Sequence, residues 1–104
     1  MSPIETLVKI FYEHFINISV GMMYDGRYMV SAENCYIKER PGALWGAYGK
    51  GHTPDAAALD YVKTLKKHGK VVYWNGPKKD IEFTPEQLAD MELCINKAKL
   101  FGVQ

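Results

Sequence analysis

The sequence predicts a single α+β domain with the element order αβββαβα, in which helices pack on an antiparallel sheet. Three observations predict it. Proline follows serine or threonine at Ser2-Pro3, Thr53-Pro54 and Thr84-Pro85, and each pair leads into a segment of helical periodicity. Alternating apolar residues flank Asp25-Gly26, which is typical of a hairpin. The 104 residues contain no repeat, low-complexity tract or linker, so we expect residues 1–104 to form one compact domain.

The first helix is expected over residues 3–16. Ser2, Pro3 and Glu5 fit a capping box. In this motif the serine caps the helix, and the glutamate three residues later accepts a hydrogen bond from the backbone N–H of the serine. Apolar residues then recur at helical spacing: Ile4, Leu7, Val8, Phe11 and Phe15.

The strands of the first half are predicted from the alternation of apolar and other residues along the chain. Residues 18–24 and 28–32 alternate around Asp25-Gly26, which we expect to be a two-residue loop with positive φ at both positions. The second strand is expected to continue to Ile37 with an irregularity near Glu33-Asn34. A turn at 40–42 then precedes a third strand over 43–47.

The second half holds a helix, a short strand and a last helix. Thr53, Pro54 and Asp55 open the second helix, which Gly69 ends. Its expected buried stripe is Ala58, Tyr61, Val62 and Leu65. Residues 71–74 form the strand. The last helix begins after Thr84 and ends before Gly102, with an expected apolar face of Leu88, Met91, Ile95 and Ala98.

Composition and charge exclude several classes of protein. The formal net charge of +1 gives no general electrostatic case for binding nucleic acid or a membrane. No apolar run approaches the length needed to span a bilayer, and no leader is visible at the N-terminus. The two cysteines, Cys35 and Cys94, have no CxxC spacing, which favours reduced, packed thiols in a cytoplasmic protein.

Residues that could support catalysis do not form a recognisable motif. His14, His52 and His68 lie far apart, and none has metal-binding spacing. No serine occupies a nucleophile elbow. We therefore expect a protein that is not an enzyme and that carries no metal and no cofactor.

The stretch from Gly49 to Thr53 raises the question of phosphate binding. Gly46, Gly49, Lys50 and Gly51 fit neither the P-loop spacing nor the dinucleotide-binding pattern. A single anion at the backbone amides of residues 54–56 stays open as a minor alternative, because helix N-termini favour anions.

The same stretch resembles part of a double-stranded RNA-binding domain. Gly49-x-Gly51-x-Thr53, with alanines at 57 and 58, is similar to the last third of that family, as is the αβββα order of residues 3–67. The resemblance implies the αβββα fold of the family, with a surface that contacts RNA phosphates. The family's lysine pair at the helix start is replaced here by Pro54-Asp55.

Residues 18–74 also resemble the HicB-like antitoxin domain. That family has a hairpin, a Pro-Gly, a short strand and Gly-x-Thr before a helix. Here Tyr24–Tyr28, Pro41-Gly42 and Gly51–Ala57 stand in that order. The resemblance implies a small β-sheet domain that inhibits another protein by docking on it, without catalysis.

The charges are segregated along the chain although they nearly cancel. Six lysines and no acid occur from Lys63 to Lys79, and five acids and no base occur from Asp80 to Glu92. These blocks are either two solvated surfaces that pair with each other or binding patches. A basic patch for phosphate or nucleic acid would use Lys50, His52, Lys63, Lys66, Lys67 and Lys70. An acidic patch would use Glu82, Glu86 and Asp90, expected on one side of the last helix.

Aromatic residues make up 12% of the chain, and both faces of the predicted sheet carry large apolar groups. Either two helices cover one face while the last helix wraps to the other, or one face stays exposed as a protein interface. Candidates for that interface are Met23, Met29, Tyr36, Trp45 and Tyr48. Our leading hypothesis is a protein-binding module that inhibits or sequesters a partner protein, with a homodimer also possible; the alternative is a nucleic-acid-binding module.

Overall fold

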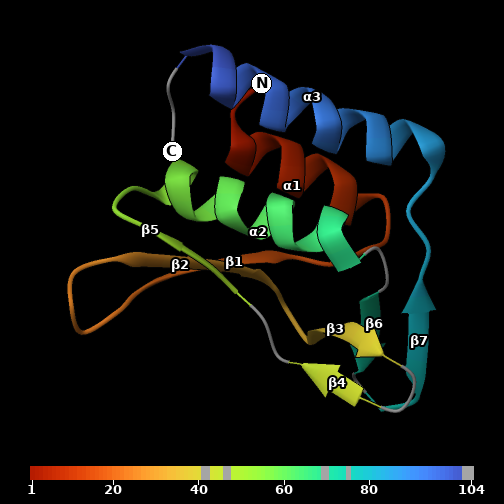
Figure 1. The fold of residues 1–104 in the computed structure, drawn as a ribbon. Coiled ribbons are helices and arrows are strands. Elements are labelled where there is room, and N and C mark those ends of the chain that lie inside the picture. The colour runs from red at the N-terminus through yellow and green to blue at the C-terminus, as the bar shows by residue number, and fades with distance from the viewer. Residues whose placement is uncertain (41–42, 46–47, 69–70, 75, 102–104) are drawn as a thin grey trace.

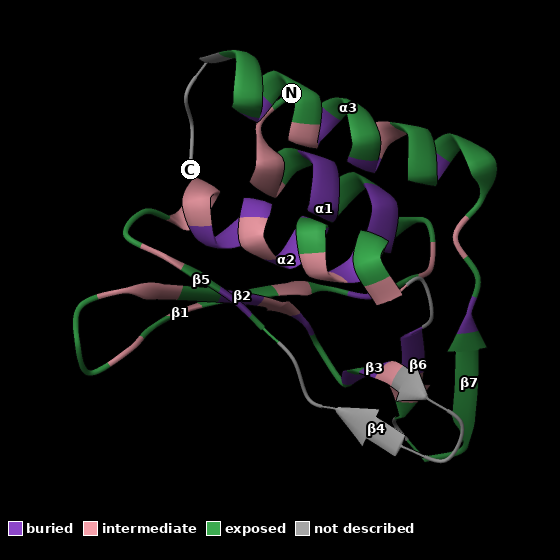
Figure 2. Cartoon of the chain, in the orientation of Figure 1, coloured by how far each residue is buried: buried purple, intermediate pink, exposed green. Residues whose placement is uncertain are grey.

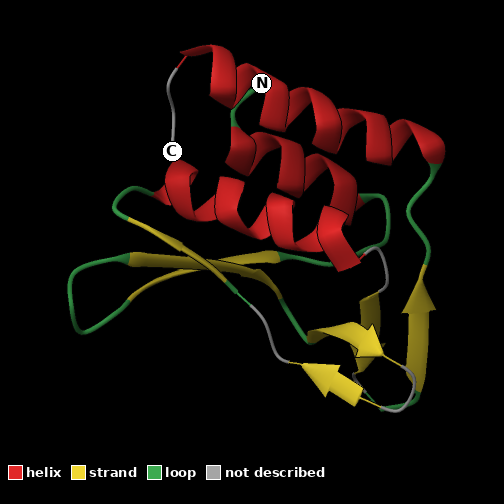
Figure 3. Ribbon diagram, viewed as in Figure 1, coloured by secondary structure: helices red, strands yellow, loops and turns green. Residues whose placement is uncertain are grey.

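In the described part of the chain, three helices lie on one side of two small antiparallel sheets (Figures 1 and 3). The computed structural model describes residues 1–40, 43–45, 48–68, 71–74 and 76–101. The elements are α1 (Pro3–Tyr12), β1 (Ile18–Met22), β2 (Tyr28–Ala32), β3 (Cys35–Arg40), β4 (Ala43–Trp45), β5 (Gly49–Gly51), α2 (Pro54–His68), β6 (Val71–Trp74), β7 (Lys78–Ile81) and α3 (Pro85–Phe101). The α+β class predicted from the sequence is confirmed.

The strands form two sheets where one was predicted. The first has the order β1-β2-β5 and the second β4-β3-β6-β7, with all neighbours antiparallel. The irregularity predicted near Glu33-Asn34 is a turn with Asn34 at φ 59°, so the second strand ends at Ala32 and its expected continuation to Ile37 is a separate strand. That turn carries the chain from β2 in the first sheet to β3 in the second. β5 and β7 were not predicted as strands.

The helices form two layers above the first sheet. α2 packs directly on β5 and β2, while α1 and α3 pack on α2 and on each other (Figure 1). Of the two arrangements that the sequence left open, the one in which the last helix covers the second face of the sheet is therefore wrong. Since α3 lies over the other helices, no helix of the described residues covers the face of the first sheet that is turned away from α2.

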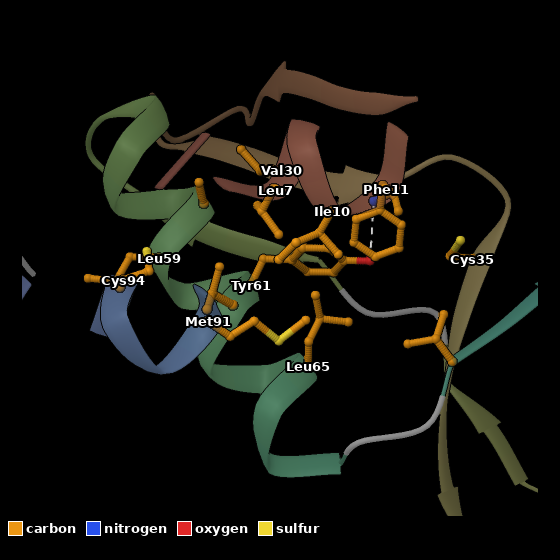
Figure 4. Packing of buried hydrophobic residues seen from close by; sticks show 14 of the residues in the cluster. Leu7, Ile10, Phe11, Val30, Cys35, Leu59, Tyr61, Leu65, Met91 and Cys94 are labelled. Atoms are coloured by element: carbon orange, nitrogen blue, oxygen red, sulfur yellow. Dashed lines mark hydrogen bonds between the residues drawn. The ribbon is translucent and has the colours of Figure 1, made fainter. Parts of the chain in front are cut away.

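The core lies between the helices and the sheets. Leu7, Ile10 and Phe11 of α1 point toward Tyr61 and Leu65 of α2 (Figure 4). Buried positions follow one stripe of each helix, while the outer surface of α3 is mostly exposed (Figure 2). The predicted stripe of α2 is confirmed: Ala58, Tyr61, Val62 and Leu65 are all buried.

Helix α1 ends at Tyr12, four residues earlier than predicted. Phe15 has φ 61°, its N–H donates to the Tyr12 carbonyl (2.9 Å), and the Ile16 N–H donates to the Phe11 carbonyl (3.0 Å). This is the Schellman pattern, in which a residue in the left-handed region ends the helix. Consequently Phe15 is 94% exposed and Ile16 is buried in its place.

The buried face of α3 also differs from the prediction. Met91 and Ala98 are buried as predicted and Ile95 is partly buried, but Leu88 is exposed, and Gln87 and Cys94 are buried in addition. Gln87 is turned inward because its side chain completes the cap of the helix: Gln87 Oε1 accepts from the Thr84 N–H (3.0 Å), and the Gln87 N–H donates to Thr84 Oγ1 (3.1 Å).

The hairpin loop has three residues and not two. The Met23 N–H donates to the Arg27 carbonyl (2.7 Å), and the Gly26 N–H donates to the Met23 carbonyl (3.0 Å). Gly26 has φ 86°, and Asp25 is not in the positive-φ region. This is a turn followed by a glycine bulge, so a single residue needs positive φ.

Candidate partner-binding face

Half-exposed apolar side chains gather on the side of the sheets that is turned away from the described helices. In β2, Val30 and Ala32 are buried toward α2, so Met29, which directly precedes Val30, points the opposite way. In β3, Tyr36 lies between the buried residues Cys35 and Ile37 and is likewise turned outward. Strand alternation thus places Met29 and Tyr36 outside the core.

Met29, Tyr36 and Tyr48 line the same shallow pocket, of about 420 Å³, at the junction of the two sheets. Ser19, Ser31, Glu33 and Asn34 complete much of its wall. Met29 also lines a neighbouring hollow of about 560 Å³ with Met23 and Tyr24. The structure therefore brings together three interface candidates that are well separated in the sequence.

Trp74 extends this cluster, and sequence reasoning missed it as a site residue. Its ring packs edge-on against Tyr36, with 6.0 Å between ring centroids, and Lys78 Nζ lies 4.2 Å above the Trp74 ring. The arrangement follows from strand register, because Tyr36 pairs with Val72, two residues from Trp74, and Trp74 pairs with Lys78. We call Met29, Tyr36, Tyr48 and Trp74 the aromatic face; each is between 36 and 45% exposed.

Two sequence candidates lie outside what the structure describes. The backbone of Trp45 belongs to β4, but its side chain is outside the described part. Lys70 is outside the described residues altogether.

The three acidic candidates do not form one helical surface. Glu82 lies between β7 and α3, before the helix begins, so the expectation that it shares a side of the last helix is wrong. Glu86 is exposed on α3, and Asp90 pairs with Lys9 of α1 (3.2 Å). Figure 1 shows α3, the helix of Glu86 and Asp90, on the far side of α2 from β2, the strand of Met29.

The basic candidates on α2 are exposed, and one is neutralised by α3. Lys63, Lys66 and Lys67 are all exposed, and Lys66 Nζ lies 2.5 Å from Glu92 Oε2. This contact lowers the pKa of the Glu92 carboxyl. Lys9–Asp90 and Lys38–Asp80 (3.1 Å) also use acids of the second block, so the two blocks are partly paired within the domain.

The glycines at 49 and 51 have a packing role. A Cβ on Gly49 would lie 2.1 Å from the Ala57 carbonyl oxygen, and one on Gly51 would lie 2.7 Å from the Ala57 nitrogen. Between them, Lys50 is exposed, and its backbone N–H donates to Asp60 Oδ2 (3.0 Å). Glycine is therefore required for β5 to touch α2, which explains the motif without a ligand.

One of the backbone N–H groups at the start of α2 already has a hydrogen-bond acceptor within the chain. Thr53 Oγ1 accepts from the Ala56 N–H (3.0 Å), and Asp55 Oδ1 accepts from the Ile4 N–H at the start of α1 (3.4 Å). A carboxylate stands at this helix end, and His52 is exposed beside it. These features weaken the case for an anion site there.

The reactive side chains are mostly engaged in packing. Burial raises the pKa of the Cys35 thiol to about 12, and burial also raises the pKa of Cys94. His14 Nε2 lies 3.1 Å from Gln87 Oε1, so this imidazole holds α3 against the end of α1. Within the described residues, no group of three or more His, Cys, Asp or Glu is placed to hold a metal ion. No helix in the described ranges is long and apolar enough to cross a bilayer.

Comparison of the chain with protein families, with curated proteins and with solved structures gives no match.

Proposed function

We propose that this protein is a non-enzymatic binding module that inhibits or sequesters a partner protein by covering part of its surface with the aromatic face. The observation that carries the proposal is the pocket shared by Met29, Tyr36 and Tyr48, which Trp74 continues on the side of the sheets turned away from the described helices. Tyrosine and tryptophan dominate the binding energy of protein interfaces.

The composition around the pocket favours a protein partner. Serine and asparagine line it beside the tyrosines, as they do in antibody combining sites, where tyrosine supplies rigid area and small polar residues supply hydrogen bonds. Both signs of charge flank the face, because Lys78 stacks on Trp74 and Glu33 lines the pocket. Such a face suits a mixed protein surface better than a polyanion.

The inhibitory part of the proposal comes from the resemblance of residues 18–74 to HicB-like antitoxin domains. Proteins of that type act by occupying a partner and need no catalytic group. The chain is compatible with that mode of action, since its cysteines are buried and Tyr36, Tyr48 and Trp74 are accessible.

The nucleic-acid alternative is favoured by the exposed lysines Lys63 and Lys67 on one helix. The contact between Lys66 and Glu92 removes a third charge from that surface. A phosphate-binding surface would also lose affinity steeply as the salt concentration rises, which an aromatic interface would not.

The test is a pull-down from a lysate of the native host with the tagged protein, half of the lysate being treated with nuclease. The bait is the wild type, the double variant Tyr36→Ala/Trp74→Ala, or Tyr12→Ala, which removes an exposed tyrosine from α1. The proposal requires a stoichiometric protein that survives nuclease, remains with Tyr12→Ala and is lost with the double variant. If nuclease abolished recovery of the partner, the ligand would be nucleic acid. If the double variant recovered as much partner as the wild type, the aromatic face would not be the binding surface.

A further inference from the structure

The edge strands of the two sheets differ in how well they are protected against pairing with another chain. β5 and β4 are three residues long, and β7 carries Lys78, Lys79 and Asp80. Short strands and charged side chains are the usual devices that keep an edge from pairing. β1 has neither: it is five residues long, with the sequence Ile-Ser-Val-Gly-Met, and it contains no charge and no proline.

The backbone of β1 presents every second residue to the open edge. Asn17 and Met23 hydrogen-bond with Glu33 and Arg27 at either end of the β1–β2 register, so the odd-numbered residues turn their N–H and C=O groups toward β2. The N–H and C=O groups of Ile18, Val20 and Met22 therefore point away from β2. In the described part of the chain, β2 is the one strand that pairs with β1.

We propose that β1 pairs antiparallel with β1 of a second copy of this chain, forming a symmetric dimer with one continuous sheet. The two-fold axis passes between the two Val20 residues, so that Val20 faces its own copy and Ile18 faces Met22 of the other copy. All three facing pairs are of the hydrogen-bonded kind, because their polar groups all point outward. The absence of charge in β1 is what makes the strand compatible with itself, since self-pairing of a charged strand places like charges opposite each other.

Side chains on the helical side of β1 support the same interface. Val20 and Met22 share a face with the buried residues Val30 and Ala32, yet they are 47% and 64% exposed. Val8 of α1 is also exposed, and α1 contacts β1. A strand pair of five residues buries less area than a stable dimer needs, so these side chains supply the additional apolar contact.

The dimer does not rest on the proposed function. Val20 lines neither of the two hollows beside Met29, and its side chain is on the opposite face of the sheet from Met29. A change at Val20 therefore tests self-pairing while leaving the aromatic face in place.

The experiment compares the wild type, Val20→Lys and Leu93→Lys by sedimentation velocity over protein concentrations from about 5 to 200 μM, the range in which moderate interfaces dissociate. Val20→Lys places two like charges at the two-fold axis, whereas Leu93→Lys adds the same charge to an exposed site on α3. We expect the wild type and Leu93→Lys to reach twice the monomer mass and Val20→Lys to remain a monomer that still unfolds cooperatively on heating.

Hydrogen exchange of the β1 amides supplies a second readout that a general surface effect would not reproduce. In the dimer the amides of Ile18, Val20 and Met22 gain protection as concentration rises, while those of Ser19 and Gly21 are protected throughout. A wild type that stays monomeric over the whole range overturns the proposal and leaves the β1 edge to a different partner. A dimer that persists in Val20→Lys, or that leaves the three amides unprotected, overturns it as well.

Discussion

Gly49 on β5 and Ala57 on α2 approach so closely that a Cβ on the glycine would lie 2.1 Å from the Ala57 carbonyl oxygen and 2.4 Å from the Tyr61 nitrogen. Both atoms are backbone, so neither can turn aside as a flexible side chain could. The contact joins the helical layer to the edge of the first sheet. It depends on a residue without a side chain.

Gly49→Ala is therefore expected to lower the free energy of unfolding by about 3 kcal/mol or more, because β5 must separate from α2 to admit the methyl group. Chemical denaturation monitored by circular dichroism measures the loss. Gly21→Ala is the matched control, since its Cβ would meet the flexible Met29 side chain at 3.4 Å. A similar, small loss in both variants would show that the close contact is not a constraint.

Tyr61→Phe tests a hydrogen bond at the point where the first sheet narrows. The pairing of β5 with β2 ends at Val30, and the buried Ala32 N–H donates instead to the Tyr61 hydroxyl at 3.2 Å. Removing the hydroxyl leaves that N–H without a partner, so we expect a loss of about 1 to 3 kcal/mol in unfolding free energy. Tyr48→Phe, which removes an exposed hydroxyl, is expected to change stability by less than about 0.5 kcal/mol.

The Cys35 thiol is expected to react slowly in the native protein at neutral pH. Burial raises its pKa to about 12, so little thiolate, the reactive form, is present. Labelling with a thiol reagent at pH 7.5 should be slow for both cysteines and fast after denaturation. Rapid modification of the folded protein at Cys35, located by mass spectrometry, would contradict the burial of this side chain.

The pairing of Glu92 with Lys66 should appear in an acid titration. The hydrogen bond from Lys66 holds the pKa of the Glu92 carboxyl below its ordinary value, so folding favours its charged form. The resulting stabilisation is present at neutral pH and is lost as the pH falls through the unfolded value toward the folded pKa. An NMR titration should show the Glu92 pKa rising in Lys66→Gln, and an unchanged pKa would mean that the two side chains do not pair in solution.

Local signals in the sequence were enough to place the helices. Ser2, Thr53 and Thr84 each mark a helix start, because a capping side chain and the following proline act within one turn of the chain. The end of α1 was mispredicted because Phe15 occupies a left-handed position that glycine usually fills.

The sheets and the candidate site depend on contacts between distant segments. β5 carries glycines because α2 lies against it, so its sequence has no apolar alternation that could reveal a strand. β7 is a charged edge with little apolar signal. Sequence patterns suggested Met29, Tyr36 and Tyr48 as exposed, but Trp74 joined them only through the register of β3 with β6.

The central claim is that the aromatic face binds a protein partner, and the most direct measurement is the affinity of that partner for three forms of the protein. Titration calorimetry would compare the wild type, Tyr36→Ala/Trp74→Ala and Tyr12→Ala, each shown by its melting curve to be folded. The account predicts that the double variant binds at least about 30-fold more weakly, which corresponds to the ~2 kcal/mol typical of an interface hot spot, and that Tyr12→Ala binds as the wild type does. Equal affinities of the wild type and the double variant would contradict it.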